Sequence, residues 1–124
     1  LELMVKRSAT RVAFGKPIAK LGKNLELIAR ARIEIDAMKL MVLQAAKAMD
    51  VLGNKEARVY VSAVKAMVPE KVCLIIDQAI QMHGGIGVTD EYDIGFYLKR
   101  ARVAEQIFGT SEYHQARYAD ISGF

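Results

Sequence analysis

The chain has 124 residues, of which 52% are hydrophobic, and it carries a formal net charge of +4 at pH 7. A chain of this length can bury a core as one domain without support from disulfides or metal ions. Its longest uninterrupted apolar run, Val72 to Ile76, is far shorter than the roughly 20 residues of a membrane-spanning helix, so no membrane span is expected. The single cysteine, Cys73, cannot form an internal disulfide, and the positive charge favours anionic partners in general terms.

The first helix is expected from Leu3 to Ala13. Apolar periodicity begins at Leu1 with no capping residue before it, and no export signal is visible. We therefore expect residues 1–124 to form one helical domain that is a fragment of a longer chain and begins inside a helix. The lone Cys73 fits a reducing compartment, the cytoplasm or the mitochondrial matrix if the source is eukaryotic.

A long helix is expected from Leu21 to Leu52, because apolar side chains recur there every seven residues in two registers. The first register is Ile28, Ile35, Val42 and Met49, and the second is Ala31, Met38, Ala45 and Leu52. More apolar residues, Ile33, Leu40 and Leu43, lie on a second flank, so this helix is expected to pack against more than one neighbour. The many alanines and methionines of the seam are interpreted as adaptable core filling.

After a stop at Gly53-Asn54, helical periodicity returns from Glu56 to Met82. Pro69 lies inside this segment, but the apolar stripe continues in phase across it, which favours one kinked helix over two short helices. Further helices are expected from Ile94 to Gln106 and, capped by Ser111, from Ser111 to Ile121. No segment alternates with the period of two that β-strands require, so the predicted fold is all-α, an antiparallel four-helix bundle without a β-sheet.

Three motifs stand at the connections between these helices. Arg11 to Ile18 reads R-V-A-F-G-K-P-I, Gln81 to Gly87 reads Q-M-H-G-G-I-G, and Gly109 to Glu112 reads G-T-S-E. Glycine permits positive φ and lets another molecule approach bare backbone, although a glycine after a helix is most often only a C-terminal cap. In order and spacing, the three motifs together resemble the C-terminal helical domain of the acyl-CoA dehydrogenases.

The resemblance covers essentially the whole chain, and it implies a flavoenzyme that binds FAD and introduces a double bond into an acyl-CoA thioester. Electrons would pass to an electron-transferring flavoprotein or a similar acceptor, and the protein would be a homodimer or homotetramer. Arg11 matches the arginine that reaches the FAD diphosphate of a neighbouring subunit, and Phe14 matches a residue that lies against the cofactor. The remaining cofactor-binding residues implied by the resemblance are Gln81, Met82, His83, Gly84, Gly85, Thr110 and Glu112.

Several of these residues also have a purely structural interpretation. Phe14 fits a core aromatic in a turn equally well, and His83, without a second ligand at helical spacing, is expected to be a packed, neutral loop histidine. Lys20 and Lys23 are interpreted as solvated surface charges. Nucleic acid is not expected as a partner, because Phe14 is the only aromatic among the basic residues near the first motif.

The identity of the catalytic base is not apparent from the sequence. Phe108 occupies the position where the family usually has a glutamate, and a phenyl ring cannot accept a proton. The base could be a glutamate upstream of Leu1, or Glu105, although one helical turn of about 5.4 Å makes Glu105 a poor substitute. Otherwise the protein is a related acyl-CoA oxidase or flavin monooxygenase, or a non-catalytic structural bundle.

Overall fold

The computed structural model describes all residues from Leu1 to Phe124. It is built almost entirely from helices, as predicted. The five α-helices are α1 (Glu2–Thr10), α2 (Asn24–Leu52), α3 (Asn54–His83), α4 (Ile94–Gln106) and α5 (Ser111–Ser122). Two 3-10 helices, η1 (Ile18–Lys20) and η2 (Gly84–Val88), and two short strands, β1 (Val12–Ala13) and β2 (Lys16–Pro17), complete the fold.

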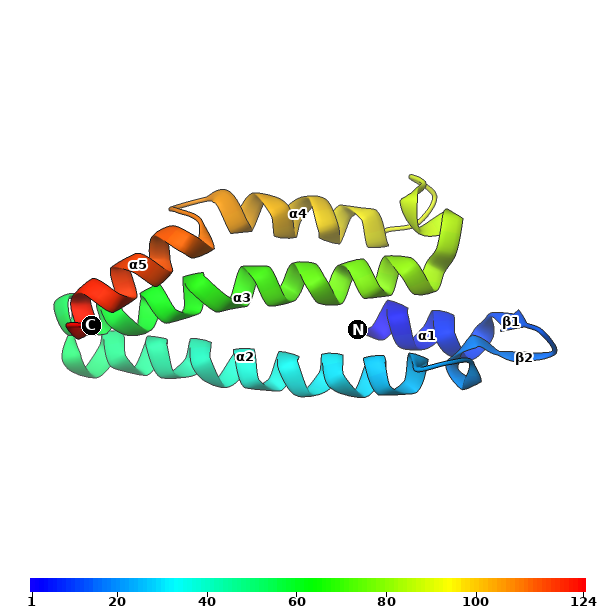
Figure 1. The fold of residues 1–124 in the computed structure, drawn as a ribbon, viewed down its shortest axis with the longest axis horizontal. Helices are drawn as coiled ribbons and strands as arrows, with labels where there is room; N and C mark the ends of the chain where they lie inside the picture. Colours follow the sequence, from blue (N-terminus) through cyan, green and yellow to red (C-terminus); the bar gives the residue numbers. More distant parts are fainter.

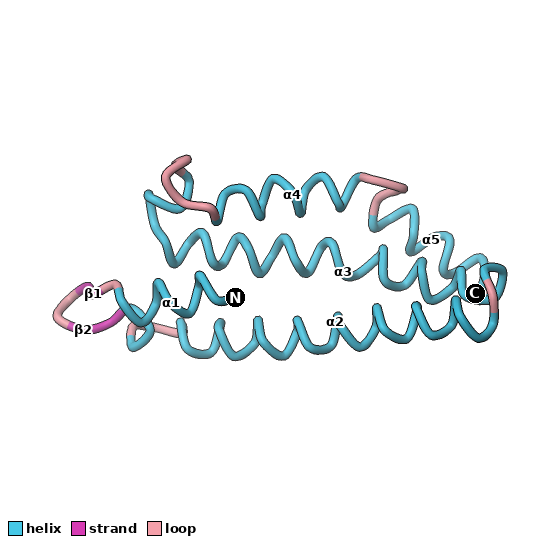
Figure 2. Tube along the Cα trace, turned by 180° about the vertical axis from the view of Figure 1, so that it is seen from behind, coloured by secondary structure: helices cyan, strands magenta, loops and turns pink.

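The helix α3 forms the centre of the molecule (Figure 1). The antiparallel helix α2 packs along one side of it, and α4 and α5 follow each other along the other side. The short helix α1 lies beside α2 and α3 at the end that also carries the hairpin and η2, as the view from behind shows (Figure 2). Because α4 and α5 share one long position, the five helices fill the four positions of the predicted antiparallel bundle.

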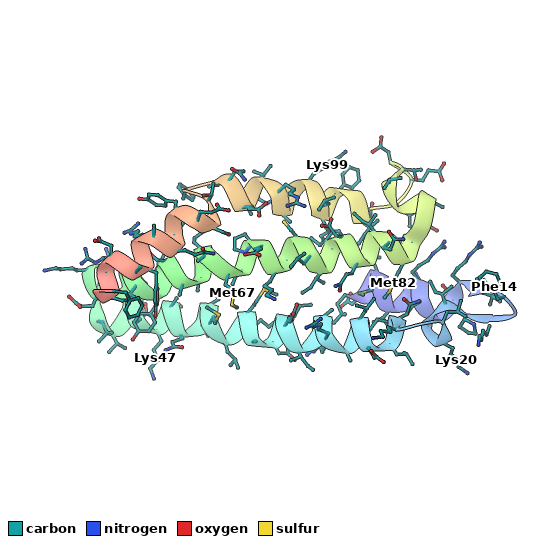
Figure 3. The ribbon with its side chains drawn as sticks, viewed as in Figure 1. Phe14, Lys20, Lys47, Met67, Met82 and Lys99 are labelled. Carbon is teal, nitrogen blue, oxygen red and sulfur yellow. The ribbon has the colours of Figure 1, made fainter.

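The main core lies where α1, α2, α3 and α4 meet. Its buried residues are Met4, Ala31, Met38, Ile75, Ala79, Met82 and Ile94. Met67 adds to it from the space between α2 and α3 (Figure 3). Three methionines among the buried residues confirm the interpretation of methionine as core filling.

The two predicted registers of α2 differ in burial. Ala31, Met38 and Ala45 of the second register are buried, but Leu52 is 53% exposed. In the first register Ile28 and Ile35 pack against the core, whereas Val42 and Met49 are 44% and 40% exposed. Leu3 of α1 and the preceding Leu1 pack against the core cluster, but α1 does not extend beside the second half of α2 (Figure 1). The far half of the seam is therefore only partly covered within this chain.

The connection between α1 and α2 corrects the prediction that this domain contains no β-sheet. The first helix was predicted to reach Ala13, but it ends at Thr10, and Val12–Ala13 pairs antiparallel with Lys16–Pro17. The two residues between the strands, Phe14 and Gly15, have φ values of 52° and 76°. Positive φ at both central residues is the geometry of a type I′ hairpin turn, and it is incompatible with a continuing helix.

The helix α3 begins two residues earlier than predicted, and it continues as one element through Pro69, which excludes two short helices. It ends at His83, and the next residue, Gly84, has a φ of 68° and a ψ of −151°, in a region that essentially only glycine adopts. The Gly84 N–H donates to the carbonyls of Gln81 and Ile80, so this glycine is a C-terminal cap. None of the helices combines the length and apolar character that crossing a membrane requires.

A second glycine of the same motif is required by space rather than by φ. A Cβ added to Gly87 would lie 2.8 Å from His83 Cβ and 2.9 Å from the Ile80 carbonyl oxygen, whereas a Cβ added to Gly85 would meet nothing within 4 Å. The segment η2 can therefore fold back against the end of α3 only because residue 87 lacks a side chain.

Alanine substitutions in this motif should separate the two constraints. Gly84→Ala places an alanine in a backbone conformation with positive φ that only glycine adopts readily. It should therefore lower the free energy of unfolding by about 1–3 kcal/mol. Gly87→Ala should cost a similar amount, about 1–3 kcal/mol, because the new methyl group overpacks the end of α3. Gly85→Ala, the matched control, should change stability by less than about 1 kcal/mol. Urea unfolding with an unchanged m-value would measure all three, and a neutral Gly84→Ala would contradict the described backbone.

Candidate functional site

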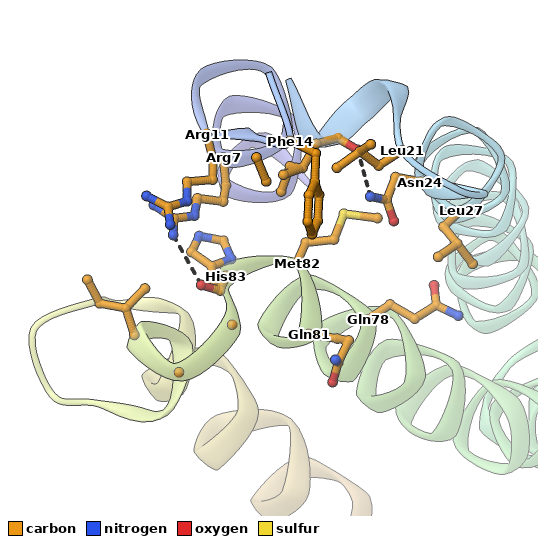
Figure 4. Close-up of a pocket in the computed structure, with 15 residues that line it drawn as sticks. Arg7, Arg11, Phe14, Leu21, Asn24, Leu27, Gln78, Gln81, Met82 and His83 are labelled. Atoms are coloured by element: carbon orange, nitrogen blue, oxygen red, sulfur yellow. Dashed lines mark hydrogen bonds between the residues drawn. The ribbon is translucent and has the colours of Figure 1, made fainter. Parts of the chain in front are cut away.

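A pocket of about 780 Å³ lies where the end of α1, the hairpin, the start of α2 and the end of α3 with η2 come together (Figure 4). It gathers seven of the nine residues proposed from the sequence: Arg11, Phe14, Gln81, Met82, His83, Gly84 and Gly85. The first two motifs, separated by the whole of α2 and α3 in the chain, are thus the two sides of one pocket.

The charged residues that line this pocket are all basic. Arg7 and Arg11 are its only charged lining residues, and neither forms an ion pair with an acidic side chain of the chain. The pocket is also lined by the amides of Gln78 and Gln81 and by the exposed Gly84. A pocket with two guanidinium groups and no carboxylate favours an anionic ligand.

Arg7 was not recognised in the sequence. It lies in the last turn of α1, four residues before Arg11, the extended residue that follows the helix, and its Nη2 donates to the backbone carbonyl of His83 at 3.2 Å. Its Nε is buried without a hydrogen-bond partner. The available signal was the spacing of four between two arginines within the helix predicted from Leu3 to Ala13, because that spacing places two residues of a helix on one face.

His83 is a packed side chain, as expected. It is buried at 4% exposure, its Nδ1 lies 2.7 Å from the carbonyl of Ala79, and its ring meets Tyr92 edge-on at 5.8 Å. Because a carbonyl oxygen only accepts, Nδ1 carries the proton. No cluster of three or more His, Cys, Asp or Glu side chains is placed to hold a metal ion.

Phe14 is not a core aromatic, so that structural alternative was wrong. Its side chain is 94% exposed and projects from the hairpin turn at one end of the molecule (Figure 3). A bulky residue with positive φ is strained by about 1–3 kcal/mol, and such strain persists only where the surroundings impose it. Both the strain and the exposure of a large apolar ring point to a contact outside this chain.

The other two proposed site residues, Thr110 and Glu112, do not reach this pocket. They lie at the α4–α5 turn, at the opposite end of α4 from η2 (Figure 1). In this turn Phe108 has a φ of 63° and is 89% exposed. The buried ring of His114 donates from Nε2 to the Phe108 carbonyl at 2.8 Å and so holds the strained backbone in place.

The cap of α5 is Thr110, which corrects the prediction of Ser111. The Thr110 hydroxyl accepts a hydrogen bond from the Tyr113 N–H at 3.4 Å, whereas Ser111 is the first helical residue and its buried hydroxyl has no partner. The Glu112 carboxylate accepts from its own backbone N–H and from the Thr110 hydroxyl, and these two bonds, in that order, lower the pKa of Glu112 below its ordinary value of 4.5. The prediction failed by one residue, because either hydroxyl satisfies the same local pattern.

Glu105 turns toward α3 and is already engaged. Its Oε2 accepts from Arg102 Nη1 at 3.1 Å and lies 3.9 Å from the thiol of the buried Cys73. Arg102 also pairs with Asp77 of α3 at 3.5 Å. The carboxylate of Glu105 therefore joins α4 to α3 instead of facing the exposed Phe108.

Comparison with known proteins agrees with this geometry. The family model described as the C-terminal domain of acyl-CoA dehydrogenase matches residues 1–122. The chain therefore belongs to the acyl-CoA dehydrogenase family and corresponds to its C-terminal domain.

Individual relatives show the same correspondence. Acyl-CoA dehydrogenase family member 10 of mouse is 40% identical over 98% of this chain, and the probable acyl-CoA dehydrogenase FadE2 of Mycobacterium tuberculosis is 42% identical over 92%. The chain spans only 11% and 28% of the length of these two relatives.

Solved structures share the fold. A Mycobacterium abscessus protein provisionally described as an acyl-CoA dehydrogenase is 38% identical, with a TM-score of 0.94 over 98% of this chain and 30% of that one. A more distant structure, the FAD complex of PigA, has a TM-score of 0.89 at 20% identity, over 98% of this chain and 31% of that one, and shows the same fold.

The cap of α5 can be tested with two substitutions. Thr110→Ala should lower the free energy of unfolding by about 1 kcal/mol, whereas Thr110→Ser, which keeps the hydroxyl, should cost less.

Because Thr110→Ala also removes the second bond to the carboxylate, the pKa of Glu112 should move back toward 4.5. Because the pKa of Glu112 is lower in the folded protein than in the unfolded chain, the ionised carboxylate stabilises the fold at pH values above the unfolded pKa. This stabilisation is lost as the pH falls through the folded pKa, in the acid range below 4.5. Titration of the Glu112 carboxyl by NMR would measure the shift, and equal pKa values in Thr110→Ala and the unmodified protein would contradict it.

Proposed function

We propose that this chain, residues 1–124, is the C-terminal helical domain of a longer FAD-dependent acyl-CoA dehydrogenase, and that its pocket is one wall of the FAD site. The observation that carries the proposal is the convergence of the Arg11–Ile18 and Gln81–Gly87 segments on one pocket with two arginines and no acid. Membership in the acyl-CoA dehydrogenase family indicates the class of reaction, the dehydrogenation of an acyl-CoA thioester.

The lining residues fit the chemistry of FAD. A diphosphate suits the guanidinium of Arg11, and it can approach the chain closely at Gly84 and Gly85, which carry no Cβ, although the Gly84 N–H itself is bonded within the helix cap. The exposed amide of Gln81 can hydrogen-bond an adenine edge, and the exposed ring of Phe14 offers an apolar surface. When bound, FAD accepts the hydride that leaves Cβ of an acyl-CoA thioester, and this domain binds and orients it.

The pocket is one-sided, so we infer that a second subunit completes it in a homodimer or homotetramer. The 94% exposure of Phe14 leaves its ring without a cover in this chain. The outer flank of α2 also carries exposed apolar side chains, with Ile33, Leu40, Leu43 and Val51 between 65% and 70% exposed, as an oligomer interface requires. An electron-transferring flavoprotein or a similar acceptor would then reoxidise the flavin, in the cytoplasm or the mitochondrial matrix.

The base that removes the α-proton belongs, on this proposal, to a part of the protein outside these 124 residues. Phe108 cannot accept a proton, and Glu105 is held by Arg102 against α3. A general base must come within about 2.6–3.2 Å of its proton, which a carboxylate turned toward α3 does not do.

The same Phe108 favours a second candidate function that needs no removal of an α-proton: a related flavin monooxygenase, or a non-catalytic bundle that keeps the oligomer together. A related acyl-CoA oxidase is a further alternative. Anaerobic mixing of the full-length protein with an acyl-CoA separates the candidates. Bleaching of the flavin absorbance supports dehydrogenation or oxidation, whereas a bound flavin that stays oxidised contradicts both.

Removal of the Arg11 guanidinium should weaken FAD retention rather than the chemical step. A hydrogen bond to a charged group is worth about 1.5–3 kcal/mol, so Arg11→Ala should raise the Kd for FAD about 10- to 100-fold. Lys20→Ala removes the same charge from an exposed position outside the pocket and should leave the Kd nearly unchanged. Fluorescence quenching of added FAD would measure both, and equal effects of the two substitutions would contradict a direct contact.

Replacement of Glu105 by Gln should leave flavin reduction by acyl-CoA within a few-fold of the unmodified protein. Loss of a general base would instead slow reduction by about 10²–10⁴-fold. Stopped-flow reduction, with FAD content and the circular dichroism melt as controls for the lost Arg102 pair, gives the answer. A loss of that size in a folded, FAD-loaded variant would identify Glu105 as the base.

A further inference from the structure

Arg7 joins two parts of the pocket that are far apart in the chain. It comes from the last turn of α1, and its Nη2 donates to the carbonyl of His83 at the end of α3, 76 residues away. The last carbonyls of a helix have no partner within the helix, so an outside donor satisfies a group that would otherwise be unpaired. Because Gly84 follows His83 directly, this hydrogen bond fixes the point at which the Gly84–Gly85 backbone leaves α3.

Most of the hydrogen-bonding capacity of Arg7 remains unused. A guanidinium has five N–H donors, but the His83 carbonyl is the single acceptor that Arg7 contacts in this chain, and Nε is buried without a partner. Leaving a buried donor unpaired is unfavourable, and no carboxylate lies within ion-pair distance to compensate it.

The second arginine makes this arrangement still less favourable without a ligand. Arg7, from the last turn of α1, and Arg11, which directly follows this helix, extend toward the same side of the pocket, next to His83 (Figure 4). Two guanidinium groups held on the same side of one pocket repel each other. A ligand with two adjacent negative charges would relieve this repulsion and give the free N–H groups acceptors in one step, whereas a neutral ligand would do neither.

We propose that Arg7 is a second arginine of the diphosphate subsite, which it also positions through the His83 carbonyl. With Arg11 it forms a pair of guanidinium groups for the two phosphates of the dinucleotide, while its Nη2 holds the Gly84–Gly85 backbone on the other side of the same anion. This assignment rests on the proposed function for the identity of FAD as the ligand, but the anion subsite itself rests on the pocket alone.

The test compares Arg7→Gln, Arg7→Lys and Arg11→Gln in the full-length protein, with Lys20→Gln as the matched control for loss of a surface charge. Two ligands are used: FAD, and inorganic pyrophosphate, which carries the anionic group without the flavin. Arg7→Gln should weaken both ligands about 10- to 100-fold, and the salt dependence of the remaining affinity should be shallower because one charge is missing. Arg7→Lys, which keeps the charge, should recover part of the affinity and most of the salt dependence.

The positioning role has its own measurement, made without ligand. Amide hydrogen exchange at Gly84 and Gly85 should be faster in Arg7→Gln but not in Arg11→Gln, since Arg11 has no hydrogen bond to the His83 carbonyl. An unchanged circular dichroism spectrum and melting temperature within a few degrees would show that Arg7→Gln remains folded. If Arg7→Gln does not fold, the same measurements are made with Arg7→Lys.

The outcomes distinguish this inference from the proposed function. Binding of pyrophosphate that needs Arg7, in a protein that does not bind FAD, supports the subsite and contradicts FAD as its ligand. Binding of both ligands to Arg7→Gln with unmodified affinity, while Arg11→Gln loses them, overturns the role of Arg7. Failure of the unmodified protein to bind either ligand overturns the anion subsite together with the proposed function.

Discussion

The fold depends on one constraint, that α3 must pack against all four other helices at once. A helix with neighbours on several sides can have few large side chains among its buried positions, and those of α3 are mostly small: Ala57, Ser62, Cys73 and Ala79. Close approach on these faces brings α2 and the α4–α5 layer against a single central helix. Where α3 ends, its neighbours end or turn as well, and the pocket forms at this shared boundary. The position of the candidate site is therefore determined by the point at which α3 ends.

Most of the fold could be predicted from periodicity, because burial of one face of a long helix repeats at a fixed interval. The seam of α2 and the stripe of α3 are patterns of this kind. The hairpin could not be predicted, because its strands are two residues long and depend on positive φ at Phe14, a residue that rarely adopts it. The local sequence of residues 11–13 is compatible with a helix, but the hairpin turn that follows requires these residues to be extended.

The candidate site was predictable only as far as its motifs resembled a family. Arg11 and Gln81 stand at fixed places in such motifs, so the resemblance could propose both as cofactor-binding residues, and the structure brings both to one pocket. Arg7 belongs to no motif, and a surface arginine without a role is the ordinary expectation for its residue type. Its importance arises from a contact across 76 residues, which no local pattern contains. Thr110 and Glu112 were grouped with the pocket by resemblance, but α4, at about 1.5 Å per residue over 13 residues, separates them from it by roughly 20 Å. A ligand that contacts both regions from one chain must be extended, or else the two regions serve sites in different subunits.

The thiol of Cys73 provides an internal reporter of motion between α3 and α4. It is buried between these helices, and burial, followed by the nearby Glu105 carboxylate, raises the pKa of the thiol above its ordinary value of 9.0. The thiolate is the reactive form, so in the closed structure the sulfur is both inaccessible and chemically quiet at neutral pH. Alkylation at this position must wait for α4 to lift away from α3. The rate of modification by a small thiol reagent thus gives the rate constant of local opening when modification is faster than reclosing. When reclosing is faster, the rate is proportional to the opening equilibrium constant.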